Sequence, residues 1–129
     1  GSDSINLMIG QNIIKAIGRG INPTVALKLL DEDTVLETIN ILDYSGKSKN
    51  KLVRIRGRVI GTRGKAREHI EELTHTNISV YGKTITIIGN YEAVSLARKA
   101  VESILSGSRH STIYQWLERQ AREKRQGFY

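Results

Sequence analysis

Two glycines at a four-residue spacing are the residues best placed to hold a charged ligand. They enclose Thr62 and Arg63 in the run Gly61-Thr62-Arg63-Gly64, and Lys65 follows directly. Glycine has no Cβ atom, so a sugar-phosphate chain can approach the backbone of such a turn closely. A helix beginning near Lys65 would point its free N–H groups at a phosphate, and the two cations add charge. The run therefore predicts a clamp for a nucleic-acid backbone, and the competing interpretation is a structural turn without a ligand.

The same search finds little that could perform catalysis. Gly64-Lys65 does not belong to a P-loop, because Val59 stands where that motif needs glycine and Ala66 where it needs serine or threonine. The three histidines lack the spacing of a metal site, and no nucleophile is paired with a base. The absence of cysteine excludes disulfides and thiolate chemistry. We therefore expect no enzyme activity, no metal and no cofactor.

Charge is distributed unevenly along the 129 residues, whose net charge is +7. Residues 1–50 carry five Lys/Arg and six Asp/Glu, whereas residues 51–129 carry fifteen and seven. A basic surface favours a polyanionic partner, with a generic soluble basic domain as the alternative. No apolar run approaches the roughly 20 residues that a membrane span needs. No signal peptide is recognisable, so we expect a cytoplasmic protein without a membrane partner.

The first part of the chain is predicted to be helical. Isoleucine recurs at every fourth residue from Ile5 to Ile17, which makes one apolar stripe that ends at Gly18. Asn22 followed by Pro23 is typical of the start of a second helix. The expected buried face of this second helix consists of Ala26, Leu29 and Leu30.

The middle of the chain is predicted to form a strand at about residues 38–43 and a helix at about residues 50–60. The helix would turn three apolar side chains inward: Leu52, Ile55 and Val59. A basic ridge containing Arg54 and Arg58 would occupy another face. A strand over the same residues is the competing interpretation, and we prefer the helix because it places Arg54 and Arg58 together.

The remaining elements are predicted from apolar periodicity and turn residues. They are a helix from about Lys65, strands at about residues 77–81 and 84–88, a helix from Asn90 to Gly107, and a last helix at about residues 112–125 with a basic side. Gly82-Lys83 joins the two strands as a tight hairpin, with glycine in the position that a type II′ turn requires.

The predicted order from Thr38 to Ser106 is strand, helix, helix, strand, strand, helix, with the glycine turn between the first two helices. This is the order of a type I KH domain, whose GxxG loop clamps about four nucleotides. We therefore expect an α+β fold in which a three-stranded antiparallel sheet packs against three helices, with extra N-terminal and C-terminal helices. The expected units are an N-terminal helical segment at 1–33, a KH domain at 34–107 and a C-terminal basic helix at 108–129.

The predicted RNA-binding surface continues from the clamp into an apolar groove beside the second strand. Ile60, Ile78 and Val80 are candidates for its floor, and ordinary core packing is their alternative role. Arg58 and Arg67 are candidates for contacts with bases or phosphates, and a solvated cation is the alternative for each. The whole predicted set is Arg54, Arg58, Ile60, Gly61, Thr62, Arg63, Gly64, Lys65, Arg67, Ile78 and Val80.

Several stretches of the chain resemble the archaeal partner-of-Nob family, also called Dim proteins. They are Ala16-Ile17-Gly18-Arg19-Gly20, Asn22-Pro23, Leu29-Leu30-Asp31, Asp43-Tyr44-x-Gly46-Lys47-Ser48-Lys49-Asn50, Gly57-Arg58-Val59-Ile60-Gly61-x-x-Gly64-Lys65 and Ser79-Val80-Tyr81-Gly82-Lys83-Thr84. The resemblance covers roughly residues 5–125. One departure is Arg63, which stands where the family usually has glycine.

This resemblance implies a small-subunit ribosome-assembly factor that binds small-subunit rRNA near its 3′ end. It implies two protein partners, the Nob-type endonuclease and the alpha subunit of translation initiation factor two. By carry-over, residues 61–64 clamp the RNA backbone and Arg58, Lys65 and Arg67 support it. The family also has a first KH-like unit, of which only the last helix, about residues 4–17, is expected here. That helix either exposes an apolar face or packs on the second unit.

Two other functions stay open at this point. The chain could be a protein-interaction module that docks an endonuclease or initiation factor through Tyr114 and Trp116 of its last helix. It could also bind single-stranded DNA, because the contact with the 2′-hydroxyl group that distinguishes RNA depends on geometry.

Overall fold

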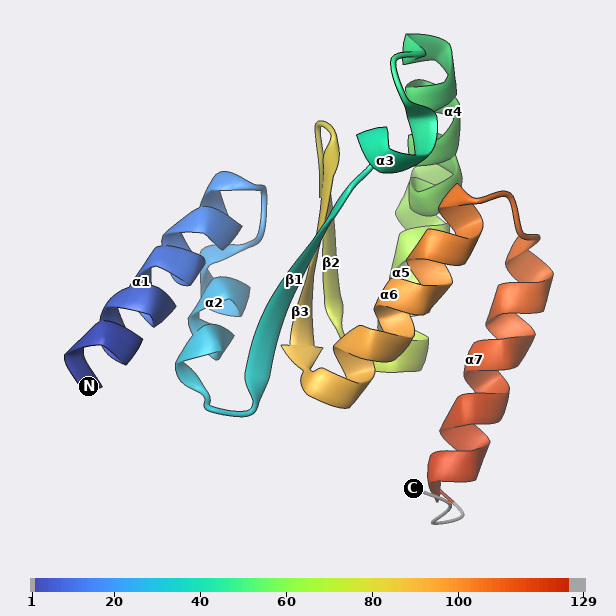
Figure 1. The fold of residues 1–129 in the computed structure, drawn as a ribbon. Coiled ribbons are helices and arrows are strands. Elements are labelled where there is room, and N and C mark those ends of the chain that lie inside the picture. The colour runs from blue at the N-terminus through green and yellow to red at the C-terminus, as the bar shows by residue number, and fades with distance from the viewer. Residues whose placement is uncertain (1, 126–129) are drawn as a thin grey trace.

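A three-stranded sheet separates two groups of helices in the computed structural model, which describes residues 2–125 (Figure 1). The elements are α1 (Ser2–Gly18), α2 (Pro23–Ala26), η1 (Leu27–Leu30), β1 (Thr34–Asn40), α3 (Leu42–Ser45), α4 (Lys49–Ile60), η2 (Thr62–Gly64), α5 (Lys65–Thr74), β2 (Asn77–Tyr81), β3 (Thr84–Asn90), α6 (Tyr91–Leu105) and α7 (His110–Arg125). This order confirms the predicted α+β fold. The outermost parts of the predicted end segments, residues 1 and 126–129, lie outside the described residues.

The sheet has the order β1-β3-β2 and is antiparallel throughout. Its central strand is buried on both faces: Ile85 and Ile87 belong to the main core, whereas Ile88 packs with the N-terminal segment. Tyr81 pairs with Thr84, so the hairpin loop contains only two residues, and Gly82 has the positive φ of +56° that was expected for it. The strand β2 is left as an edge, and its outer side faces α5.

Helices α4, α5 and α6 cover one face of the sheet, as a KH domain requires (Figure 1). The predicted helix after residue 48 is confirmed: Ser48 Oγ accepts a hydrogen bond from the Lys51 amide at 3.1 Å, and Ile55 and Val59 are buried. Asn90 caps α6 in the same way, accepting from the Ala93 amide at 2.8 Å. Because Lys49–Ile60 form the helix α4, the competing prediction of a strand over residues 50–60 is excluded.

The first strand lies further toward the N-terminus than predicted, at Thr34–Asn40 rather than residues 38–43. It ends because the Asn40 side chain accepts a hydrogen bond from the Leu42 amide at 3.0 Å, which turns the chain into α3. Ile41 is fully buried, but its burial follows from this turn and from its amide bonding to the Lys83 carbonyl at 2.8 Å.

The C-terminal helix α7 packs against α5 and α6 and completes the main core. Ile113 and Leu117 are buried in the same cluster as the sheet residues, and Trp116 and Tyr114 are half-buried against it. Deleting this helix would therefore expose the core as well as remove the surface that a docking partner could contact.

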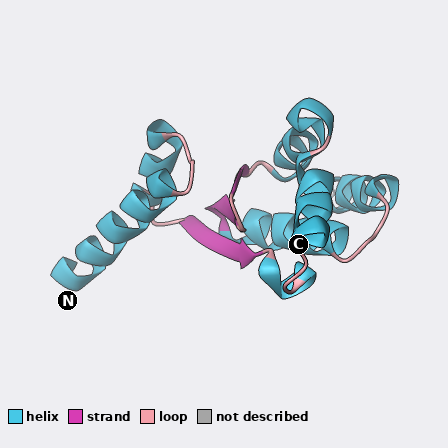
Figure 2. Ribbon diagram, turned by 90° about the horizontal axis from the view of Figure 1, so that it is seen from above, coloured by secondary structure: helices cyan, strands magenta, loops and turns pink. Residues whose placement is uncertain are grey.

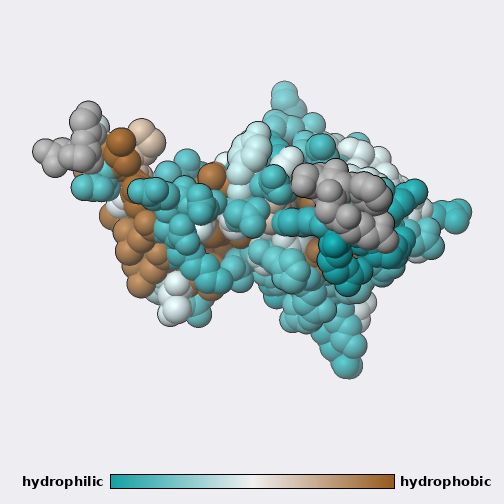
Figure 3. Space-filling view, turned by 90° about the horizontal axis from the view of Figure 1, so that it is seen from below, coloured by the Kyte–Doolittle hydropathy of each residue, from teal (hydrophilic) through white to brown (hydrophobic). Residues whose placement is uncertain are grey.

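The sequence left two alternatives for the N-terminal helix α1, an exposed apolar face or packing on the second unit, and the helix shows both. Its last turns pack through Ala16 beside Ile21, Leu29 and Ile88, while its apolar residues further forward are solvent-exposed, such as Met8 at 60% and Ile14 at 72%. Figure 2 shows α1 projecting away from the helices on the other side of the sheet, and Figure 3 shows an apolar surface gathered over it.

The predicted burial of Leu30 is wrong, because this side chain is 64% exposed. The helix that begins at Pro23 tightens into the 3-10 turn η1 after Ala26. Three residues per turn instead of 3.6 rotate the end of the segment, so Leu29 faces inward and Leu30 outward.

Candidate nucleic-acid interface

The glycine turn joins α4 to α5 and contains three residues with positive φ. Gly61 has φ +74°, Arg63 has φ +57° and ψ +28°, and Gly64 has φ +74°. Thr62, Arg63 and Lys65 are exposed on it, and none of the three side chains has a hydrogen bond or ion pair within the described chain. The turn therefore presents two cations to solvent, while the Lys65 amide bonds back to the Thr62 carbonyl.

The two glycines have different roles. A Cβ atom at Gly61 would lie 2.5 Å from Ala66 Cβ and 2.7 Å from the Ala66 amide, so glycine there allows α5 to pack against the end of α4. A Cβ at Gly64 would meet only the Arg67 guanidinium, at 3.6 Å. The expected close approach of a ligand backbone is thus a property of the Gly64 side of the turn.

On the β2 side of α5, the polar side chains bond to one another and to the edge strand. Arg67 Nη1 donates to Glu71 Oε1 at 2.6 Å and to the Ile78 carbonyl at 3.3 Å. Glu71 Oε2 accepts from the Ile78 amide at 2.7 Å. Burial raises the pKa of the Glu71 carboxyl above its usual value, although the Ile78 amide and Arg67 act in the opposite direction. Glu71 thereby closes the edge of β2 at Ile78.

The predicted groove residues divide between core and surface. Ile78 is 3% exposed, so its side chain belongs to the core and does not line an open groove, which corrects that prediction. Ile60 and Val80 are half-buried. Backbone groups of alternate strand residues point to the same side, so Val80 presents its N–H and C=O on the edge that Glu71 and Arg67 close at Ile78. The Val80 N–H and C=O have no hydrogen-bond partner within residues 2–125, so this part of the strand edge, beside α4, remains open.

Arg58 has a different role from the one predicted. Its guanidinium donates to the Ile104 carbonyl and, at 2.6 Å, to the Ser108 carbonyl, which fixes the connection between α6 and α7. His110 Nε2 donates in turn to the Arg58 carbonyl at 2.7 Å. The predicted free ridge of Arg54 and Arg58 does not form, because Arg58 is half-buried and bonded, whereas Arg54 is exposed and has no partner within residues 2–125.

The sequence interpretation missed Arg56, which lies on the opposite side of α4. Arg56 Nε donates to the Gly82 carbonyl at 3.0 Å, and the rest of its guanidinium has no partner in the described chain. Arg56 therefore lies between the clamp and the β2–β3 hairpin. A signal was present: Arg56 precedes Ile60 by four residues, so the two share a helix face.

Within residues 2–125, no three His, Asp or Glu side chains gather into a group that could hold a metal ion. None of the helices in this range combines the length and the hydropathy that a bilayer span requires. The exposed, unpaired groups of the interface are cations and backbone amides, which suit a polyanion.

A glycine clamp between the first two helices of this sheet-and-helix unit defines a KH domain of type I. Residues 35–122 match the eukaryotic-type KH-domain (KH-domain type I) family. The chain is 48% identical over 118 residues to a KH domain-containing protein of Methanocaldococcus jannaschii, covering 92% of this chain and 52% of that protein. It is 34% identical to the RNA-binding protein pno1 of Drosophila pseudoobscura pseudoobscura over 113 residues, covering 87% and 48%. The chain belongs to the partner-of-Nob (Dim-type) KH proteins.

Solved structures agree with this assignment. A protein of unknown function from Aeropyrum pernix superposes with a TM-score of 0.89 at 43% identity, over 95% of this chain and 65% of that one. Dim2p in a complex of a/eIF2alpha, aDim2p and rRNA from Pyrococcus horikoshii gives 0.83 at 41% identity, over 90% and 63%. The chain spans about half the length of the curated relatives and just under two thirds of these structures.

Proposed function

We propose that this chain binds single-stranded RNA and acts, without catalysis, in the assembly of the small ribosomal subunit. The observation that carries the proposal is the turn Gly61–Gly64 with the adjoining Lys65, where the Arg63 and Lys65 side chains are exposed and have no partner within residues 2–125. Relatives are named as RNA-binding and pre-rRNA-processing proteins, and a structural neighbour is held in a complex with rRNA. These names support small-subunit rRNA as the ligand.

The contacts proposed for RNA follow the exposed groups. Thr62, Arg63, Gly64 and Lys65 would hold the backbone, and the half-buried Ile60 and Val80 would contact the bases beside it. Among the arginines of α4, Arg56 and not Arg58 would be the cation that contacts the RNA. Two further members of the sequence-based set are assigned supporting positions: Gly61 shapes the turn, and Arg67 holds the β2 edge closed next to it.

The test replaces the two exposed clamp side chains in Thr62→Asp/Arg63→Asp. We expect affinity for a single-stranded RNA from the small-subunit rRNA 3′ end to fall by about 100-fold, because one cation is lost and two anions face the phosphates. Both positions are exposed, and aspartate tolerates left-handed backbone, so the free energy of unfolding should change by no more than about 0.5 kcal/mol. Fluorescence anisotropy measures the binding.

The matched control is Gln11→Asp/Lys15→Asp, which makes the same change of charge on the exposed side of α1, across the sheet from the clamp (Figure 1). RNA affinity of this control should stay within about threefold of the parent. Equal losses of RNA affinity in the two double variants would mean that binding depends on overall charge and not on the clamp. A DNA oligonucleotide of the same sequence, binding as tightly as the RNA, would instead assign the site to single strands of either kind.

Partners and setting belong to the same proposal. The complex of a relative with a/eIF2alpha supports contact with the alpha subunit of initiation factor two, and a Nob-type endonuclease and a cytoplasmic location follow from ribosome assembly. Because α7 buries Ile113 and Leu117, a docking role for this helix is tested by Arg119→Ala/Arg122→Ala on its exposed side. Loss of the partner in a pull-down, with RNA binding intact, would favour docking.

We also propose that α1 is the last helix of a preceding unit. Exposed apolar residues on α1 and η1 support this proposal, because a soluble domain rarely leaves such a patch uncovered. A longer chain that includes the preceding half should bind less of the dye anilinonaphthalene sulfonate per molecule than the present chain. Equal dye binding would contradict the proposal.

A further inference from the structure

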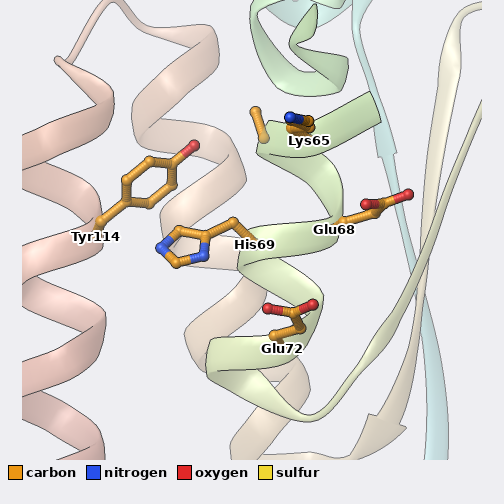
Figure 4. A pocket seen from close by; sticks show the side chains of 6 residues that line it. Lys65, Glu68, His69, Glu72 and Tyr114 are labelled. Carbon is orange, nitrogen blue, oxygen red and sulfur yellow. The ribbon is translucent and has the colours of Figure 1, made fainter. Parts of the chain in front are cut away.

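A hollow of about 420 Å³ lies between α5 and α7, immediately beside the clamp (Figure 4). Lys65, His69 and Glu72 line it from α5, on one helical face, and Tyr114 lines it from α7. Lys65 belongs to the clamp itself, so the hollow opens where an RNA backbone held at residues 61–64 would leave the turn. This is the side of α5 opposite to β2.

Of the five polar side chains that line this hollow, four lack hydrogen-bond or ion-pair partners within residues 2–125, and the fifth, Glu68, lies 3.9 Å from the Arg67 guanidinium. Lys65, His69, Glu72 and the Tyr114 hydroxyl make no hydrogen bond or ion pair within the described residues, whereas Arg67 and Glu71 on the other side of α5 are fully engaged. Burial raises the pKa of the Tyr114 phenol, so this group stays protonated and able to donate at neutral pH. Four polar groups that converge without partners indicate room for a ligand that supplies them.

The aromatic side chains of the hollow are held in place rather than free. The rings of His69 and Tyr114 meet edge to face at 4.4 Å. Tyr114 also lies one turn beyond His110, which is anchored to the Arg58 carbonyl. Arg58 in turn fixes the chain that leads into α7. A fixed aromatic ring is the usual platform for an unstacked base, because stacking needs no rearrangement of the protein.

The charges of the hollow select one part of a nucleotide over the other. Lys65 lies at the end next to the clamp and suits a phosphate, whereas Glu72 further along α5 would repel one, and the Glu68 side chain points away from Tyr114 (Figure 4). Carboxylate oxygens accept hydrogen bonds, so they suit base edges that carry an amino group. The arrangement fits a nucleotide with its phosphate at Lys65 and its base toward Tyr114 and Glu72.

We propose that the α5–α7 hollow binds one nucleotide of the RNA that flanks the four held by the clamp, with the base stacked on Tyr114 and an amino group of the base bonded to Glu72. This inference rests on the proposed RNA-binding function and extends it to a fifth position. It also gives Arg58 and His110 a positioning role, because they fix α7 at the distance that forms the hollow. Guanine, adenine and cytosine carry the amino group, and uracil does not.

The experiment uses nested RNAs from the small-subunit rRNA 3′ end: a tetramer, and the same tetramer lengthened by one or two nucleotides at either end. Each added position carries 2-aminopurine in turn. Wild-type protein should gain about tenfold in affinity from the correct added nucleotide and quench its fluorescence. In Tyr114→Leu the gain and the quenching should disappear while tetramer affinity is unchanged. Tyr114→Phe, which keeps the ring, should keep both.

A second variant tests the base edge and does not depend on Tyr114→Leu remaining folded. With uridine at the added position the wild type should bind about fivefold more weakly than with cytidine, and Glu72→Ala should bind the two alike. If the wild type binds the tetramer but gains nothing from any added nucleotide, or gains equally in Tyr114→Leu, the hollow is not an RNA site. If the wild type binds none of these RNAs, the proposed function fails as well.

Discussion

Charged residues of similar types lie on both sides of helix α5, but they have opposite roles. Toward β2, Arg67 and Glu71 bond to each other and to the Ile78 backbone, so that the edge of the sheet is closed. Toward α7, Lys65 and Glu72 line a hollow and have no hydrogen-bond or ion-pair partner in the part of the chain that the structure describes. A charged residue beside a clamp is therefore informative about ligand binding only once its hydrogen bonds and ion pairs within the protein are known. Saturated groups stabilise the fold, and unsatisfied groups are available to a ligand.

Removing one carboxylate from each side should separate these purposes most sharply. Glu71→Ala leaves the Ile78 amide without its acceptor and removes the shorter of the two bonds that the Arg67 guanidinium donates, and we expect the free energy of unfolding to fall by about 2 kcal/mol. Glu72→Ala should change it by no more than about 0.5 kcal/mol. Urea denaturation at neutral pH measures both. Similar values for the two variants would mean that the two sides do not differ.

The pH dependence of stability is tested with Glu71→Gln, whose side-chain carbonyl oxygen can still accept a hydrogen bond from the Ile78 amide. Because burial raises the folded-state pKa of Glu71, its ionisation costs the folded state more than the unfolded one. The contribution of Glu71 to stability is therefore complete below its unfolded pKa of about 4.5 and declines as pH rises through the folded value. The stability of Glu71→Gln relative to the parent should increase from pH 4 to pH 7.

Two arginines on one face of α4 repeat the comparison between bonded and unbonded side chains. Arg58→Ala should destabilise the protein by about 2 kcal/mol, since it strips two carbonyls of a charged donor. Arg54→Ala, its exposed neighbour, should be nearly neutral. Neither change should alter affinity for a four-nucleotide RNA, and a loss of affinity in the folded Arg58→Ala protein would return Arg58 to the binding surface.

The smallest effect is expected from Arg56→Ala, which acts on RNA rather than on the fold. Its single bond to the Gly82 carbonyl lies on the surface, so stability should change little. Affinity should fall by about fivefold, and the slope of log affinity against log salt should weaken by about 0.7, the value of one phosphate contact on a single strand. A titration of RNA binding at several salt concentrations provides both numbers, and an unchanged slope would remove Arg56 from the contacts.

The sequence predicted the order of the elements well because local signals govern it. Ser48 and Asn90 cap their helices, and Gly82 makes the hairpin, through bonds that span only two or three residues. The strand at Thr34–Asn40 was misplaced because burial of Ile41 imitates strand alternation after the strand has ended.

The candidate site was less predictable because its bonds connect residues far apart in the chain. Arg58 reaches carbonyls 46 and 50 residues away, which no helical period reveals. The same period had grouped Arg58 with Arg54. The hollow depends on a histidine and a tyrosine 45 positions apart, at His69 and Tyr114. Only the packing of α7 on α5 brings such residues together.

Gly61 has a consequence for how relatives of this chain can vary. Any side chain at this position would strike Ala66, so folding alone admits only glycine there, whatever the domain binds. A relative that has lost its ligand should therefore still keep this first glycine. Positions 62 to 64 carry no such restriction from Ala66. Substitution at these three positions, with the first glycine retained, would be the pattern left by a KH unit that has become a scaffold.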